Sequence, residues 1–176
     1  MKKSKIVSIV SIFLILSLSS CDLLSKKQIF INPGEVGVYF DESVEKMVLL
    51  DEGNHNISKK AMFSVYSTRT KHYYENIVIL TKDGKQVVCK IEYIYGLNLK
   101  KILELHREAG SDFEDIIIVP KINLGLRETL GKYNFEDIKA DQIEAGMMST
   151  LKNDVEFSKF IITFQCFILE IRPYKN

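Results

Sequence analysis

Residues 75–95 read ENIVILTKDGKQVVCKIEYIY and decide the fold, because they carry the clearest local pattern in the sequence. The flanks at 76–81 and 85–95 are rich in β-branched residues, which are typical of strands. Between them, Lys82-Asp83-Gly84 supplies turn residues, and the glycine can adopt the positive φ that a tight hairpin turn needs. We therefore predict an antiparallel hairpin at the centre of a sheet.

The chain before this hairpin alternates between strand-like runs and turn residues, and the chain after it changes to the period of a helix. This order predicts a single α+β domain, in which a curved, mostly antiparallel sheet is followed by three helices and a closing strand. The expected strands before the hairpin are 28–31, 35–40, 46–50 and about 57–66. The first expected helix is 99–109, the second runs from a cap at Ser111 or Asp112 to 130 with a kink or break at Pro120, and the third is 141–152. The closing strand is expected at 160–171.

The composition excludes several specialised classes of protein. The chain has 176 residues, of which 46% are hydrophobic and 27% charged, so it fits one globular domain and neither a disordered nor a polytopic membrane protein. Lys and Arg number 24 against 23 Asp and Glu. This balance argues against a nucleic-acid partner, because nucleic-acid binders usually carry a strong basic excess.

The first twenty residues have the pattern of an export signal. Three lysines are followed by an apolar run at 6–18 and then by small residues. At ~1.5 Å per helical residue this run reaches about 20 Å, which is short of the roughly 30 Å hydrocarbon core of a bilayer. A permanent transmembrane span is therefore the weaker interpretation.

Leu18-Ser19-Ser20-Cys21 at the end of this run resembles the bacterial lipobox, in which the cysteine receives a diacylglyceryl thioether. We expect 1–20 to be a lipoprotein signal peptide, Cys21 to be the lipidation site, and 21–28 to be a lipidated tether. Two or more acyl chains suffice for stable attachment. The predicted location is the cell membrane or outer membrane, outside the cytoplasm; a signal peptide with an incidental cysteine is the alternative.

Four motifs occur in a recognisable order along 29–173: Gly34-Glu35-Val36-Gly37-Val38, Gly53-Asn54-His55, Thr81-Lys82-Asp83-Gly84, and Arg127-Glu128 followed by Gly131 and Tyr133. Together they resemble the prohibitin/stomatin domain, also called SPFH or band 7. The resemblance implies a membrane-attached scaffold without catalytic activity, with homo-oligomers, other SPFH proteins or a membrane protease as partners. Family members usually reach the membrane through a hydrophobic segment, and the domain is normally followed by a coiled coil. Since this sequence has no sustained heptad run, we expect small or weak oligomers.

The residues themselves favour no enzyme. His55, His72 and His106 lack the spacing of a metal site, and we expect no catalytic, cofactor-binding or metal-binding residues. Cys89 and Cys166 lie in strand-like runs and are interpreted as buried small hydrophobes, with a disulfide between paired strands as the alternative. Acidic pairs at 114–115 and 136–137 are interpreted as first-turn acids that complement a helix dipole.

Two residue groups leave an alternative open. Five tyrosines are interpreted as cross-strand packing residues, but they can also form a ligand or lipid-headgroup surface. Five basic residues can form a rim near anionic headgroups. The competing function is therefore a lipoprotein that binds a small ligand or lipid in a pocket of the α+β domain. The tyrosines are Tyr66, Tyr73, Tyr74, Tyr93 and Tyr95, and the basic residues are Lys59, Lys60, Arg69, Lys71 and Lys82.

Overall fold

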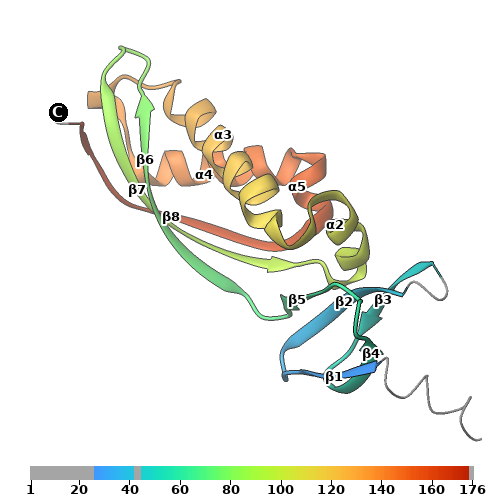
Figure 1. The fold of residues 1–176 in the computed structure, drawn as a ribbon. Coiled ribbons are helices and arrows are strands. Elements are labelled where there is room, and N and C mark those ends of the chain that lie inside the picture. The colour runs from blue at the N-terminus through green and yellow to red at the C-terminus, as the bar shows by residue number, and fades with distance from the viewer. Residues whose placement is uncertain (1–25, 42–44, 175–176) are drawn as a thin grey trace, which may run out of the picture.

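The computed structural model describes residues 26–41 and 45–174 (Figure 1). The described strands form three antiparallel sheets, in the orders β1-β4, β3-β2-β5 and β6-β7-β8. The α+β class and the antiparallel pairing are confirmed. The strands are β1 (Lys26–Ile31), β2 (Glu35–Asp41), β3 (Lys46–Leu50), β4 (Gly53–Ser58), β5 (Phe63–Ser67), β6 (Lys71–Leu80), β7 (Gln86–Leu97) and β8 (Ile161–Pro173).

The first five strands form a small unit at one end of the molecule (Figure 1). Its own core consists of Ile31, Leu50, Ile57 and Ala61, all buried. Gly37 is needed here because a Cβ at this position would lie 2.8 Å from the Cδ1 of Ile31. The missing side chain therefore lets β1 and β2 pack closely.

The predicted hairpin forms the centre of the third sheet. β6 pairs with β7 from Lys71↔Tyr95 to Leu80↔Gln86, and Gly84 adopts a φ of 75° in the turn. β8 pairs with the other side of β7, so the last strand in sequence lies beside a strand from the middle of the chain. The hairpin prediction is confirmed.

The helices cover one face of this sheet (Figure 1). Together with the inward side chains of the sheet they enclose the main core, which includes Ile122, Leu126, Ile143 and Met147, each 0% exposed. The helices are α2 (Ile102–Ala109), α3 (Val119–Leu130), α4 (Ala140–Asn153) and α5 (Val155–Phe160). A π-helical segment, Glu114–Ile118, leads into α3.

Several boundaries differ from the predictions. The strand expected around 57–66 is divided by a turn at Lys59 and Lys60. Lys26, Lys27 and Gln28, which we expected in the tether, belong to β1, because this segment pairs with β4 and the Nζ of Lys27 donates to the carbonyl of Ala61 at 3.1 Å. The described strand β1 therefore includes the last three residues of the expected tether.

The helix ends also differ. Neither Ser111 nor Asp112 caps the second helix; instead the chain passes through the π-helical segment, and Pro120 sits in the first turn of α3, where its missing N–H costs little. The capping box at 141–144 does not form, because α4 already begins at Ala140. A fourth helix, α5, was not predicted; Asp154 caps it by accepting the amide of Phe157 at 2.8 Å.

Truncation of a core side chain tests the packing of helices on the sheet. Leu126→Ala is expected to lower the free energy of unfolding by about 2–5 kcal/mol, because it removes buried methyl groups and leaves a cavity. Leu124→Ala on the same helix is the matched control, since Leu124 is 49% exposed, and we expect a change below about 1 kcal/mol. Urea unfolding followed by circular dichroism measures both. Equal losses would contradict the assigned helix face.

Candidate functional site

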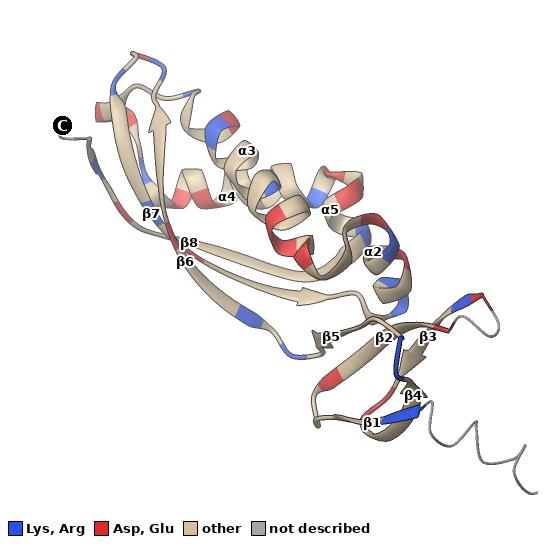
Figure 2. Ribbon diagram, viewed as in Figure 1, with Lys and Arg blue, Asp and Glu red and all other residues tan. Residues whose placement is uncertain are grey.

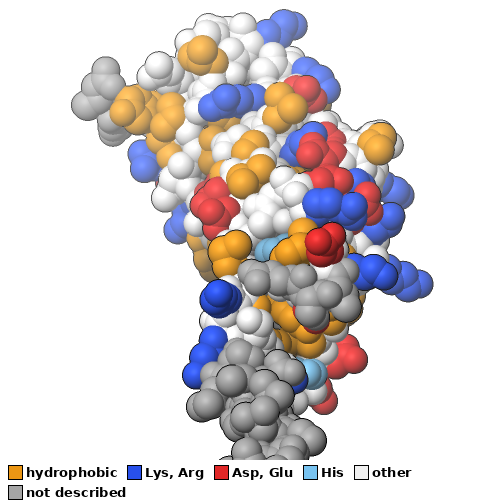
Figure 3. Space-filling view, turned by 45° about the vertical axis from the view of Figure 1, so that its right-hand side comes forward, with side chains coloured by type: hydrophobic (Ala, Val, Ile, Leu, Met, Phe, Trp, Pro, Cys, Tyr) orange, Lys and Arg blue, Asp and Glu red, His pale blue; other side chains and the backbone are white. Residues whose placement is uncertain are grey.

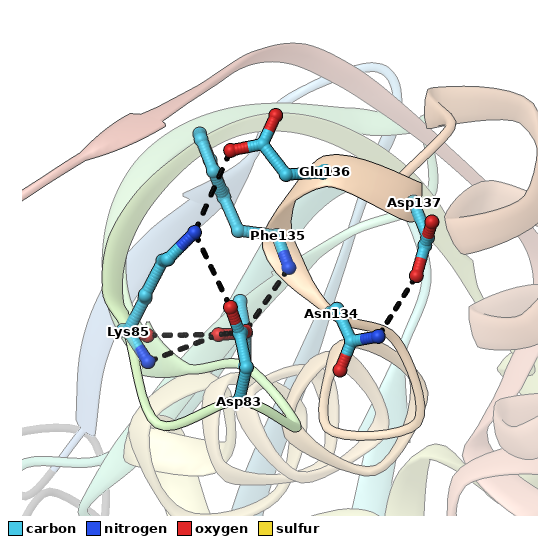
Figure 4. Close-up of polar contacts among 7 residues, drawn as sticks. Asp83, Lys85, Asn134, Phe135, Glu136 and Asp137 are labelled. Carbon is cyan, nitrogen blue, oxygen red and sulfur yellow. Dashed lines mark hydrogen bonds and ion pairs between the residues drawn. The ribbon is translucent and has the colours of Figure 1, made fainter.

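The turn of the central hairpin is fixed to the loop after α3 (Figure 4). One carboxylate oxygen of Asp83 accepts the hydroxyl of Thr81 at 2.6 Å and the amide of Phe135 at 3.1 Å, while Lys85 lies 3.3 Å from the other oxygen. Hydrogen bonding from Thr81 is the main reason that the pKa of Asp83 is lowered to about 2. The amide of Lys82 also donates to the carbonyl of Tyr133, at 2.8 Å. These contacts hold two segments together that lie about fifty residues apart.

Asp83→Ala is expected to free the amide of Phe135 and to speed its hydrogen exchange several-fold, because the carboxylate is its hydrogen-bond acceptor. Hydrogen exchange followed by NMR measures this rate. Glu136→Ala is the control, since Glu136 contacts only Lys85, at 3.5 Å, among the partners resolved in this turn. Similar exchange rates at Phe135 in both variants would show that Asp83 does not fix the turn.

β8 presents an exposed apolar edge. Among the described strands it pairs with β7 alone, so its other edge faces outward. Ile162, Phe167 and Leu169 are 67%, 40% and 47% exposed. One outward backbone amide, that of Ile168, is satisfied by the carboxylate of Glu144 at 2.7 Å. A strand with unpaired backbone groups and exposed apolar side chains can accept another chain.

A groove lies beside the start of β8, between α4 and α5. Its volume is about 370 Å³ and its wall is mostly apolar, so it extends the exposed edge of β8 onto the helical layer. On the face shown in Figure 3, exposed hydrophobic side chains lie beside charged side chains of both signs. The apolar residues that line the groove are Met148, Leu151, Phe157, Ile161, Ile162 and Phe164.

Three of the five tyrosines form a stack on the inner face of the central sheet. The ring of Tyr73 lies between those of Tyr93 and Tyr95, with centroid distances of 5.5 and 5.8 Å. The hydroxyls of Tyr73 and Tyr95 donate to the two oxygens of Glu114, at 2.5 Å each, and Lys71 also contacts this carboxylate. Burial raises the pKa of Tyr93 and Tyr95. The packing interpretation is confirmed for these rings.

The other two tyrosines lie elsewhere. Tyr74 points to the opposite face of the sheet, where its hydroxyl donates to Glu92 at 3.0 Å. Tyr66 joins β5 to the helical layer: its hydroxyl donates to the carbonyl of Gly110 at 2.8 Å and lies 2.5 Å from the Nδ1 of His106. Burial raises the pKa of Tyr66 to about 12 and lowers the pKa of His106. His106 is therefore a neutral packing residue at neutral pH.

A comparison with models of known protein families identifies the family of this chain. Residues 29–173 match the model of the SPFH domain / Band 7 family, which covers well over half of the chain. The chain belongs to this family. Proteins of the SPFH family are associated with membranes, commonly oligomerise and are generally non-enzymatic, and they act as scaffolds or regulators.

The SPFH chain is also similar to a curated protein of a different name. It is 32% identical, over 111 residues, to a protein called "Thymidylate kinase" from Neorickettsia sennetsu (strain ATCC VR-367 / Miyayama); the match covers 57% of this chain and 53% of that protein. The chain thus spans about half the length of the curated relative it matches. The sequence contains no G-x-x-x-x-G-K-[ST] phosphate-binding loop.

The basic residues do not form one rim. Lys82 lies in the β6–β7 turn, whereas Lys59 and Lys60 lie in the turn between β4 and β5, at the opposite end of the SPFH domain (Figure 2). Lys71 pairs with Glu114, and Arg69 donates to the carbonyl of Pro33 at 3.2 Å. The proposed rim is wrong because the two turns are separated by the full length of the central hairpin.

The two cysteines of the central sheet are buried core residues. Cys89 and Cys166 are both free and buried, and burial raises the pKa of each thiol to about 12. They do not form a disulfide, since β7–β8 pairing places Cys89 opposite Ile171 and Cys166 opposite Tyr93. Within residues 26–41 and 45–174, no three His, Cys, Asp or Glu side chains gather as metal ligands.

The predicted anchor lies outside the described residues, which begin at Lys26, five positions after Cys21. In the part of the chain that the structure describes, no helix is both long enough and apolar enough to cross a bilayer. The lipidation of Cys21 therefore stays a prediction.

Glu114 is the residue that sequence reasoning misinterpreted. It does not serve only as a first-turn acid, because its carboxylate receives three donors from β6 and β7. Hydrogen bonds from these donors outweigh desolvation by burial, which alone would raise its pKa, so the pKa of Glu114 is lowered. No local signal marks it, since its partners lie 19 to 43 positions away.

Proposed function

We propose that this SPFH protein is a non-enzymatic scaffold or regulator of the cell envelope, anchored to a membrane through acylated Cys21 and acting through protein–protein contacts. The observation that carries the contact role is the exposed apolar edge of β8. Membership of a membrane-associated family supports the location, and the lipobox at 18–21 supports the means of attachment. Partners of the expected kinds are further copies of the chain, other SPFH proteins, or a membrane protease.

Mass spectrometry of the native protein tests the anchor. The expected mature chain starts at Cys21 and carries the mass of a diacylglyceryl group with at least two acyl chains. A mature chain that starts at any other residue, or an unmodified Cys21, contradicts the anchor.

Affinity capture tests the contact role. The chain, cross-linked in membranes and then solubilised in detergent, is expected to recover itself or a membrane protein. Ile162→Lys should reduce this recovery about tenfold or more, because a charge would be buried in the contact. Met62→Lys is the matched control, since Met62 is 85% exposed but lies outside the β8 edge. A monomeric chain with no enriched partner, or equal recovery by both variants, argues against scaffolding through β8.

The groove between α4, α5 and β8 favours a second candidate function, which is the binding of a small apolar ligand or a lipid. Its apolar wall and volume of about 370 Å³ suit part of an acyl chain. Mass spectrometry of organic extracts of the purified protein tests this function. A stoichiometric lipid that disappears in Met148→Lys, a substitution at a groove residue that is 36% exposed, supports it, and a protein that carries none contradicts it.

A further inference from the structure

A small cavity lies where the hydroxyl ends of the stacked tyrosines meet the π-helical segment. Its volume is about 110 Å³. The sheet contributes the tyrosines and Glu75 to its wall, and the helical layer contributes Glu114 and Asp115. π-Helical turns are rare and are often found at functional sites. The cavity is separate from the β8 edge and from the apolar groove, and no function assigned so far uses it.

The charges on this cavity favour a cation. Three carboxylates line it, and no basic residue is part of the lining among the described residues; Lys71, which reaches Glu114, is already paired with it. The carboxylate of Glu114 already accepts hydrogen bonds from Lys71, Tyr73 and Tyr95, so we do not expect it to bind a ligand. Glu75 differs: one of its oxygens accepts the hydroxyl of Tyr93 at 3.1 Å, and among the described residues no ion pair neutralises it. Asp115 is exposed and also lines the cavity.

The geometry also selects among cations. A metal ion is disfavoured because the three carboxylates that line the cavity do not converge as a set of metal ligands among the described residues, and that of Glu114 is already occupied by protein donors. A quaternary ammonium group needs open aromatic faces, but the rings of Tyr73, Tyr93 and Tyr95 stack on one another at interplanar angles of 14°. Tyrosyl and carboxylate oxygens remain as acceptors, and a primary ammonium group supplies three N–H donors for them.

We propose that this cavity, called the tyrosine–glutamate pocket, binds the primary ammonium group of a small amine, with Glu75 and Asp115 as its charge partners. The volume has room for about four non-hydrogen groups, at ~30 Å³ for each water-sized group. This size fits ethanolamine, which occurs both as a free amine and as a lipid headgroup. The proposal is independent of the anchor at Cys21 and of the β8 edge.

Isothermal titration calorimetry of the full chain tests the proposal with ethanolamine as the probe. Binding of ethanolamine is expected, and choline, its trimethylated analogue, should bind at least about tenfold more weakly because it lacks N–H donors. Glycerophosphoethanolamine distinguishes the two sources: if it binds as well as ethanolamine the pocket accepts a lipid headgroup, and if it does not the ligand is a free amine. No heat with ethanolamine at millimolar concentration, or equal binding of choline, overturns the proposal.

Two variants test whether ethanolamine binds in the tyrosine–glutamate pocket. Glu75→Gln keeps the acceptor for Tyr93 and removes the charge, and Asp115→Asn removes the charge of an exposed side chain. Each should weaken ethanolamine binding about tenfold. Glu92→Gln is the matched control, because Glu92 makes the equivalent contact with Tyr74 on the opposite face of the sheet. If Glu75→Gln and Asp115→Asn, with unchanged circular dichroism, bind as tightly as the control, the proposal fails.

Discussion

Cys21→Ser is expected to abolish acylation and to move most of the chain out of the membrane fraction. A serine has no thiol to form the thioether, so the variant loses every acyl chain. Each buried CH₂ contributes about 0.8 kcal/mol to membrane binding, and two chains together make attachment effectively stable. The loss should therefore be nearly complete. Metabolic labelling with an alkyne fatty acid, followed by membrane fractionation, measures both effects.

The control for this variant is Cys89→Ala, which removes another cysteine. Cys89 is buried in β7 and free, so it cannot be reached by an acyl transferase in the folded protein. Cys89→Ala should keep the label and the membrane fraction. Labelling that persists in Cys21→Ser, or that is lost in Cys89→Ala, would show that the lipobox interpretation is wrong.

The parts of the fold that sequence predicts well are those that local chemistry determines. The turn at 82–84 forms because its glycine takes a φ of 75°, and the helix before Gly110 ends because this glycine takes a φ of 64°. α5 was missed because six residues are too few to show a helical period. The capping box at 141–144 was wrong because α4 already begins at Ala140, and the carboxylate of Glu144 instead accepts the amide of Ile168 in β8.

The candidate site was harder to predict because its contacts are long-range. The tyrosines Tyr73, Tyr93 and Tyr95 were predicted to pack within one sheet. The alternation of side chains along the paired strands β6 and β7 puts them on one face. The sequence did not indicate that Glu114 faces them, since that depends on how the helical layer packs against the hairpin. The same limit applies to Lys59 and Lys82, which share a charge but lie at opposite ends of the domain.

Glu114→Ala is expected to lower the free energy of unfolding by about 3 kcal/mol. The hydroxyl of Tyr95, in a residue that is 1% exposed, loses its acceptor, and so does that of Tyr73. A buried donor without a partner costs about 1–3 kcal/mol. Lys71 adds less, because its side chain is 36% exposed and water can solvate it. Asp115→Ala, at the adjacent exposed position, should change the free energy by less than about 0.5 kcal/mol.

The pH dependence of this loss separates the charge of Glu114 from its packing. The pKa of Glu114 is lowered from its ordinary value of 4.5, so its ionised form stabilises the fold above that value, and the contribution is lost as the pH falls through the lowered pKa. The difference in unfolding free energy between the wild type and Glu114→Ala should therefore be largest near pH 7 and shrink below about pH 4.5. Urea unfolding at pH 7 and pH 3 measures it. A difference that is the same at both pH values would mean that Glu114 stabilises the tyrosine stack by shape and not by charge, since packing contacts do not titrate.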